Sequence, residues 1–125
     1  DFGPARCIVD YNNVWEVQNY RLCGGSGDAG LPDLVGNSWV VAQQQQYLQA
    51  LKNMGVKGFR IDAAKHMPAS FMNAVLTPAI KSGMHVFGEV ITGGGAGNGE
   101  YDCFLAPYLR DTDHAAYDFP LHNQL

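Results

Sequence analysis

Hydrophobic and polar positions along the chain follow two periods, and the changes between them mark out the predicted elements. From Asn37 to Gly55 the pattern repeats every three or four positions, which predicts a helix capped by Asn37 or Ser38 and ended by the glycine. One face of this helix consists of Val40, Val41, Gln44, Tyr47, Leu48 and Leu51. The polar run 43–46 then belongs to its solvated face.

Predicted helices and strands alternate along the rest of the chain. A second helix is predicted from Pro68 to Gly83, and one of its faces consists of Phe71, Met72, Val75, Leu76 and Ile80. Short runs rich in strand formers predict strands at 58–62 and 85–90. They are followed by a glycine-rich loop at 93–99, a helix at 100–109 and a weaker strand at 114–119. Helices alternating with strands at this spacing favour parallel βα units.

Residues 1–36 have no sustained period. Glycine, asparagine, aspartate and proline recur there, and the aromatic residues fall at irregular intervals. The segment is longer than an ordinary connection inside a compact domain, so we expect it to be functional or to form a small subdomain.

The composition argues against several classes of partner. The chain of 125 residues has a net charge of −4 and no cluster of lysine or arginine, which argues against nucleic acid or an anionic membrane as partner. No apolar run approaches the roughly 20 residues that span a bilayer. There is no signal peptide and the first residue is Asp1, so we expect a trimmed N-terminus or a fragment.

The three cysteines leave two interpretations open. Cys7 and Cys23 lie in one loop-rich stretch and could close a short disulfide, with Cys103 left over. The other interpretation is three reduced thiols in a cytosolic protein. None of the three belongs to a C-x-x-C pair, so a zinc knuckle is not favoured.

Both stronger strand predictions end in an acid, Asp62 and Glu89, with one helix between them. If the strands are neighbours, their carboxyl ends lie about 4.8 Å apart, at the edge where α/β barrels hold their active sites. Carboxylates on the order of 5 Å apart are typical of retaining glycosidases, in which one attacks the anomeric carbon and the other protonates the leaving oxygen. Arg60 lies on the same strand face as Asp62 and could orient it. The simpler alternative is that these acids are helix caps or members of ion pairs.

The glycine-rich loop "TGGGAGNG" follows a strand, as phosphate-binding loops do. It fits no G-x-G-x-x-G register, and no Gly-Lys-Ser/Thr follows it. We therefore interpret it as a loop at the rim of the cleft that would hold the two acids, and not as a nucleotide site.

Three short motifs resemble the alpha-amylase family of glycoside hydrolases. "GFRIDAAKHM" (58–67) resembles the second signature region of the family, and "VFGEV" (86–90) resembles the third. "GLPDL" (30–34) is similar to a motif at the end of the domain inserted after the third barrel strand. The motifs come in the family's order, and the helix before the first region, "QYLQALKNMGVKGFRID", is also similar. The resemblance extends over most of the chain and is weakest in 1–29 and in the glycine-rich stretch.

The resemblance implies roles for five residues. Asp62 would be the nucleophile and Glu89 the general acid/base. Arg60 would orient the nucleophile and, in some members, bind chloride. Lys65 and His66 would contact glucose hydroxyls on the aglycone side of the cleft.

The resemblance also implies a calcium ion between the inserted domain and the barrel. Asp33 matches its carboxylate ligand and His66 a ligand through the backbone carbonyl, and Gln18 in "VQN" would offer another carbonyl. Hard oxygen ligands of this kind suit calcium. Outside this context, His66 would as readily be a satisfied core histidine. A disulfide between Cys7 and Cys23, which we favour, would fit a secreted enzyme.

The implied fold is α/β, part of a (β/α)8 TIM barrel, from the end of the domain inserted after strand 3 through about strand 6. Residues 1–36 would belong to the loop-rich inserted domain on its calcium-binding side, and residues 37–125 to the central part of the catalytic barrel. The family's first and fourth regions, with a third carboxylate and one calcium ligand, would lie before Asp1 and beyond Leu125.

Three functions stay open. The first is a secreted, calcium-dependent, retaining alpha-amylase that cuts alpha-1,4 links inside starch and malto-oligosaccharides, monomeric when complete and inactive as an isolated fragment. The second is another family member, a transglycosylase or an alpha-glucosidase, although the run "AAKHM" after Asp62 favours the amylase. The third is a non-catalytic relative, against which the presence of both Asp62 and Glu89 argues.

Overall fold

The computed structural model describes residues 1–93 and 99–125 and contains a three-stranded parallel sheet. Its strands β1 (Gly58–Ile61), β2 (His85–Gly88) and β3 (Ala115–Ala116) lie in that order. In the register, Arg60 of β1 is paired with Phe87 of β2, and Phe87 with Ala115 of β3. The parallel α/β arrangement predicted from the alternation is confirmed for these strands.

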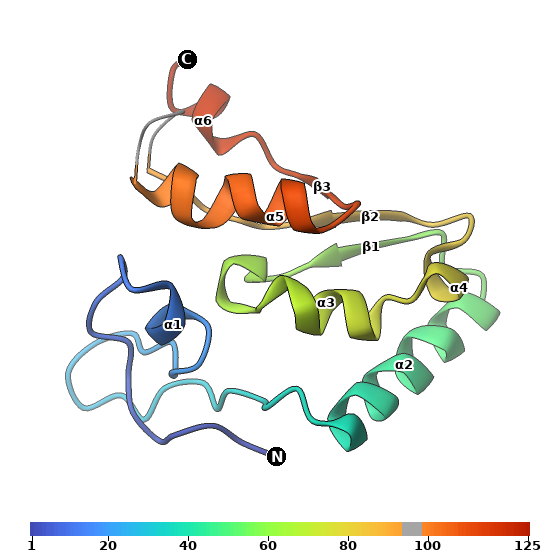
Figure 1. The fold of residues 1–125 in the computed structure, drawn as a ribbon, viewed down its shortest axis with the longest axis horizontal. Helices are drawn as coiled ribbons and strands as arrows, with labels where there is room; N and C mark the ends of the chain where they lie inside the picture. Colours follow the sequence, from blue (N-terminus) through green and yellow to red (C-terminus); the bar gives the residue numbers. More distant parts are fainter. Residues whose placement is uncertain (94–98) are drawn as a thin grey trace.

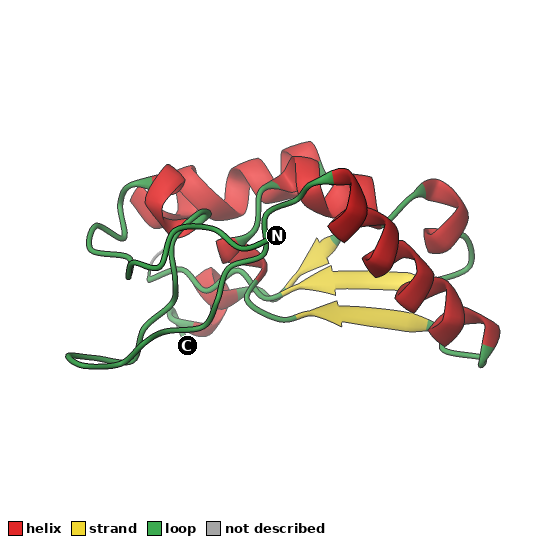
Figure 2. Cartoon of the chain, turned by 90° about the horizontal axis from the view of Figure 1, so that it is seen from below, coloured by secondary structure: helices red, strands yellow, loops and turns green. Residues whose placement is uncertain are grey.

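The main helices lie on one face of the sheet (Figure 2). Helix α2 (Ser38–Asn53) leads into β1, α3 (Ala69–Val75) and α4 (Pro78–Lys81) connect β1 to β2, and α5 (Ala106–Asp111) precedes β3 (Figure 1). Alternate strand residues pack toward the helices, in a cluster of Phe59, Ile61, Leu76, Ile80 and Val86. Arg60, between Phe59 and Ile61, therefore points to the opposite face.

Helix α2 forms where the pattern predicts it. The Asn37 side chain accepts a hydrogen bond from the Val40 N–H at 2.9 Å and so caps the first turn. Gly55 follows the last turn with a φ of +98°, a conformation that favours glycine.

The single helix predicted from Pro68 to Gly83 is wrong, because the structure divides it. Helix α3 ends at Val75 and α4 begins at Pro78. Pro78 has no N–H to donate, and its ring disfavours a helical conformation at the preceding residue. Thr77 is accordingly extended, and its hydroxyl accepts from the Ile80 N–H to cap α4.

The C-terminal elements also differ from the prediction. The helix expected at 100–109 consists of a π-helical turn, η2 (Tyr101–Leu105), followed by α5. The Ala106 N–H donates to the Tyr101 carbonyl five residues earlier, which is the π-helical pattern, and Pro107, which has no N–H, lies in the first turn of α5. The strand expected at 114–119 is reduced to the two residues of β3, and α6 (Phe119–His122) follows, capped by the Asp118 side chain.

The N-terminal segment has little regular structure, as expected. It contains one short helix, α1 (Val14–Val17), and isolated bridges. A disulfide joins Cys7 to Cys23, which confirms the pairing that we favoured and excludes three reduced thiols. Cys103 is a free, exposed thiol.

The two remaining predictions concern the glycine-rich loop and a membrane as partner. Most of the predicted rim loop at 93–99 lies outside the described residues. Within residues 1–93 and 99–125, no helix is both long enough and apolar enough to cross a bilayer.

Candidate active site

The carboxyl ends of β1 and β2 adjoin, and each is followed directly by an acid. Both strands are shorter than predicted, so Asp62 and Glu89 stand just beyond them. The Glu89 N–H donates to the Ile61 carbonyl at 2.9 Å, which extends the pairing by one residue. Figure 2 shows the strand arrowheads pointing toward the loop-rich part of the chain. Parallel α/β barrels hold their active sites at this edge.

Close packing at Gly88 brings the turn after Asp62 against β2. A Cβ atom at Gly88 would lie 2.9 Å from the Ala64 Cβ and would also overlap the Tyr108 ring, so a side chain has no room there. The missing side chain allows η1 (Ala64–His66), the turn that follows Asp62, to pack directly on β2.

Arg60 binds both acids. Its Nη1 donates to Asp62 Oδ1 at 2.6 Å and its Nη2 to Glu89 Oε1 at 2.8 Å. The hydrogen bond to Asp62, followed by the negative charge of Glu89, raises the pKa of Arg60 above its usual value. Because both nitrogens belong to one planar guanidinium, a single side chain determines how the two carboxylates lie relative to each other.

The chain turns sharply after Asp62. Ala63 is left-handed, with φ 47° and ψ 39°, which is unfavourable for a residue with a Cβ. Its N–H donates to Glu89 Oε2 at 3.3 Å, so both oxygens of Glu89 have partners. The Glu89 side chain is 22% exposed, whereas that of Asp62 is 78% exposed. Asp62 is thus open to an approaching ligand, whereas Glu89 is largely covered by protein.

Tyr117 lies beside the candidate site and was not predicted from the sequence. Its ring centroid lies 6.0 Å from the Arg60 guanidinium carbon, and it meets the Phe87 ring edge-on at 5.2 Å. The sequence alone could not locate Tyr117 here, because its place depends on the strand register that pairs Arg60 with Phe87.

Two cavities open beside Arg60. Asp62 lines the first, of about 600 Å³, and Glu89 lines the second, of about 440 Å³. The walls of the first are largely aliphatic, and the second is lined by aromatic side chains that include Tyr117 and Phe119. Aromatic and apolar walls around a few polar groups are typical of small-molecule sites.

Lys65 and His66 lie on η1, directly after the acid, and both face protein groups. The Lys65 Nζ lies 3.0 Å from Glu100 Oε1 and 4.8 Å from the centroid of the Phe104 ring. The hydrogen bond from Lys65 lowers the pKa of Glu100. His66 Nδ1 donates to the Val17 carbonyl at 3.2 Å, and burial is the main cause that lowers the pKa of His66. Contact of either side chain with a sugar stays a prediction.

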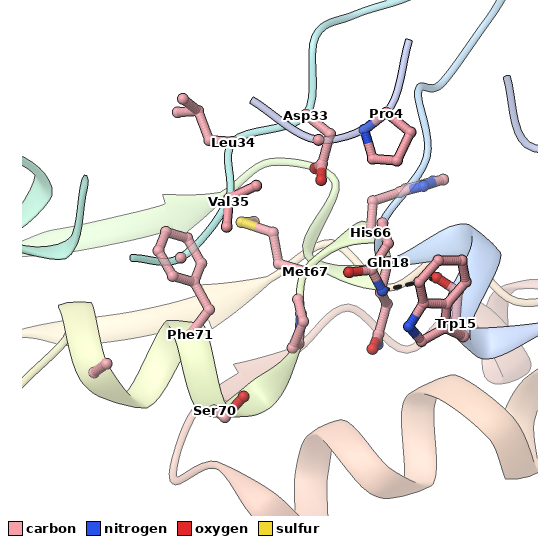
Figure 3. A pocket seen from close by; sticks show the side chains of 15 residues that line it. Pro4, Trp15, Gln18, Asp33, Leu34, Val35, His66, Met67, Ser70 and Phe71 are labelled. Atoms are coloured by element: carbon pink, nitrogen blue, oxygen red, sulfur yellow. Dashed lines mark hydrogen bonds between the residues drawn. The ribbon is translucent and has the colours of Figure 1, made fainter. Parts of the chain in front are cut away.

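The three predicted calcium ligands line one cavity of about 410 Å³ (Figure 3). Asp33, Gln18 and His66 come from three separate segments of the chain. Burial raises the pKa of Asp33, and no hydrogen bond reaches its carboxylate from the described residues. A cation would offset this cost of burying the charge. The described residues contain no group of three His, Cys, Asp or Glu side chains that could hold a metal, so a site here would depend on carbonyl oxygens, which calcium accepts.

Comparison with known proteins gives a consistent result. No protein-family model matches the chain. The chain is 62% identical to an alpha-amylase of Aeromonas hydrophila over 125 residues, which are 100% of this chain and 27% of that protein. It is 37% identical to an alpha-amylase of Thermomonospora curvata over 128 residues, 92% of this chain and 20% of that protein. A solved cyclomaltodextrin glucanotransferase is similar with a TM-score of 0.71 and 29% identity, over 96% of this chain and 23% of that one.

The parallel α/β sheet is similar to solved TIM-barrel proteins, and the named relatives place the chain in a class of glycosidases. The chain belongs to the alpha-amylase family. It spans 27% and 20% of the lengths of the two curated relatives described above.

Proposed function

We propose that this chain supplies two catalytic carboxylates of a retaining glycoside hydrolase that cleaves internal alpha-1,4-glucosidic bonds in starch and malto-oligosaccharides. The bridge from Arg60 to both Asp62 and Glu89 is the observation that carries the proposal. Asp62, the more exposed acid, is the nucleophile, and Glu89 is the general acid/base. The substrate class is supported by relatives that bear the name alpha-amylase.

In the proposed reaction, Asp62 attacks the anomeric carbon while Glu89 donates a proton to the glycosidic oxygen, and the bond between that carbon and oxygen breaks. Glu89, now ionised, takes a proton from water, and the water oxygen attacks the anomeric carbon and displaces Asp62. Arg60 aims Asp62 and balances the charge of Glu89 after its proton has left. Two displacements at one carbon retain its configuration.

The proposal includes a place for the chain in a complete enzyme. Strands β1, β2 and β3 would be about the fourth to sixth strands of the barrel, with residues 1–36 in the domain inserted after the third strand. The Cys7–Cys23 disulfide supports an extracellular location. We further propose that the complete enzyme is a monomer. Binding of chloride at Arg60 stays a prediction.

A transglycosylase is the second candidate, because the chain is similar to a cyclomaltodextrin glucanotransferase. The same covalent intermediate on Asp62 would then be attacked by a sugar hydroxyl in place of water. The product tells the two candidates apart.

A hybrid enzyme tests the proposal. Residues 1–125 replace the matched segment of the Aeromonas hydrophila alpha-amylase, which is 62% identical. We expect the hybrid to release reducing ends from starch within about tenfold of the parent rate, equivalent to roughly 1.4 kcal/mol in the barrier. Proton NMR recorded before mutarotation should detect the alpha anomer. Cyclic or lengthened products would favour the second candidate, and a folded but inactive hybrid would reject both.

Calcium is expected to stabilise the hybrid through Asp33, with carbonyl oxygens of His66 and Gln18 completing this chain's part of the site. A ligand of the native state at 100 times its Kd adds about 2.7 kcal/mol to the free energy of unfolding. Calcium should therefore raise the Tm, and a chelator should reverse the rise. Asp33→Asn should lose most of this shift, whereas Asp10→Asn, outside the cavity, should keep it. An unchanged Tm shift in Asp33→Asn would mean that calcium binds at another site.

A further inference from the structure

Tyr117 contacts the guanidinium that joins the two candidate catalytic acids, although it belongs to none of the motifs. The guanidinium carbon of Arg60 lies over the Tyr117 ring, 6.0 Å from the ring centroid. Both side chains line the cavity that Glu89 lines. Arg60 comes from β1 and Tyr117 follows β3, with β2 between these strands, so no local pattern in the sequence relates the two residues.

The neighbours of Tyr117 restrict how its ring can turn. Its backbone N–H donates to the Gly88 carbonyl at 3.4 Å, beside the end of β2. The ring meets Phe87 edge-on at 5.2 Å and Phe119 edge-on at 6.1 Å. Phe87 is paired in the register with Arg60 and therefore points to the same face of the sheet. Tyr117 thus packs against Phe87 on the face from which Arg60 projects.

The two acidic partners of Arg60 change charge during the proposed reaction. Asp62 loses its negative charge when it forms the glycosyl ester, and Glu89 becomes negative when it gives up its proton. At that stage the charge-assisted bond from Arg60 to Asp62 weakens, and the attraction to Glu89 grows. The attraction between a cation and an aromatic ring does not depend on the charge of either acid. Tyr117 is therefore a partner of Arg60 whose attraction stays constant through both steps.

We propose that Tyr117 is a positioning residue, whose ring holds the Arg60 guanidinium between Asp62 and Glu89 while the charges of the two acids change. This inference rests on the proposed function. An interaction that acts in the transition states and not in the binding of substrate changes kcat and leaves KM alone. Because Tyr117 acts through Arg60 and not on the sugar, its loss is expected to lower kcat at constant KM.

A second contact between an arginine and a tyrosine provides a matched control. The guanidinium carbon of Arg6 lies 4.6 Å from the centroid of the Tyr20 ring, in the N-terminal segment. Arg6 and Tyr20 line neither of the two cavities beside Arg60. If the loss of such a contact acted only through stability, Tyr20 and Tyr117 variants would behave alike.

Kinetics of the hybrid enzyme, which carries the whole 125-residue chain, test the role of Tyr117. In Tyr117→Leu we expect kcat on a malto-oligosaccharide to fall about tenfold with KM within about twofold, in line with the loss of one cation–ring contact. Tyr117→Phe keeps the ring, so its kcat should stay within about twofold of the parent value. Tyr20→Leu at saturating calcium should keep the parent kcat and KM.

A double-mutant cycle asks whether Tyr117 acts through Arg60. Arg60→Lys keeps the charge but loses the planar fork that reaches both acids, so it should itself lower kcat. With the fork gone, adding Tyr117→Leu should lower kcat by no more than about a further twofold.

Four outcomes would overturn this role. They are a parent kcat in Tyr117→Leu, a rise of KM at constant kcat, an equal fall of kcat in Tyr117→Phe or in Tyr20→Leu, and a full tenfold effect in the Arg60→Lys background. If Tyr117→Leu fails to fold, Tyr117→Met keeps more of the volume without the ring, and a parent kcat there also rejects the role. An inactive parent hybrid would reject the proposed function itself, whereas an active hybrid with any of the four outcomes rejects only the role of Tyr117.

Discussion

Asp62→Asn and Glu89→Gln are each expected to lower the kcat of the hybrid enzyme on starch by at least about a thousandfold. An amide in place of Asp62 cannot form the glycosyl ester, and an amide in place of Glu89 has no acidic proton to give to the leaving oxygen. The release of reducing sugar measures the effect. The Tm should stay close to that of the parent hybrid, because both side chains lie outside the apolar clusters.

A substrate with an activated leaving group separates the two roles. A leaving group that departs without protonation should restore the first step in Glu89→Gln, seen as a burst of product, and should not restore it in Asp62→Asn. Asp113→Asn serves as the control, because Asp113 lines a cavity with His85, the first residue of β2, at the edge of the sheet opposite to Asp62 and Glu89. Turnover near the parent value in either active-site variant would refute the assignment of that residue.

Loss of the Cys7–Cys23 disulfide is expected to lower the free energy of local unfolding of the N-terminal segment by about 3 kcal/mol. The two cysteines are 16 residues apart, and the cross-link restricts the unfolded segment more than the folded one. Amide hydrogen exchange of the hybrid with both cysteines changed to serine should quicken by about a hundredfold within residues 1–36. Cys103→Ser, which removes the free and exposed thiol, should leave exchange unchanged.

The same variant bears on the proposed calcium site, because Gln18 lies between the two cysteines. A more mobile segment would pay a larger ordering cost on binding the ion, so the Tm shift produced by calcium should shrink. Unchanged hydrogen exchange in the double variant would mean that the tertiary contacts of the segment, and not the disulfide, determine its stability.

Much of the local structure was determined by the sequence alone. The period of apolar residues and the cap at Asn37 define α2, because helix formation depends on neighbours three and four positions apart. Runs rich in strand formers locate β1 and β2 and put an acid after each. The break between α3 and α4 could also have been predicted, since Pro78 lies within the chain segment read as one helix.

Only the tertiary structure decided how the site is assembled. The sequence could place Arg60 near Asp62, two residues on, but the ion pair from Arg60 to Glu89 depends on which strands are neighbours and in what register. The contact of Lys65 with Glu100 likewise depends on tertiary packing, because 35 residues of sequence separate the two. Such contacts bring together groups about 30 residues apart, and their geometry depends on packing over the whole sheet, whereas the period of a sequence reports only the direction of each side chain from its own helix or strand.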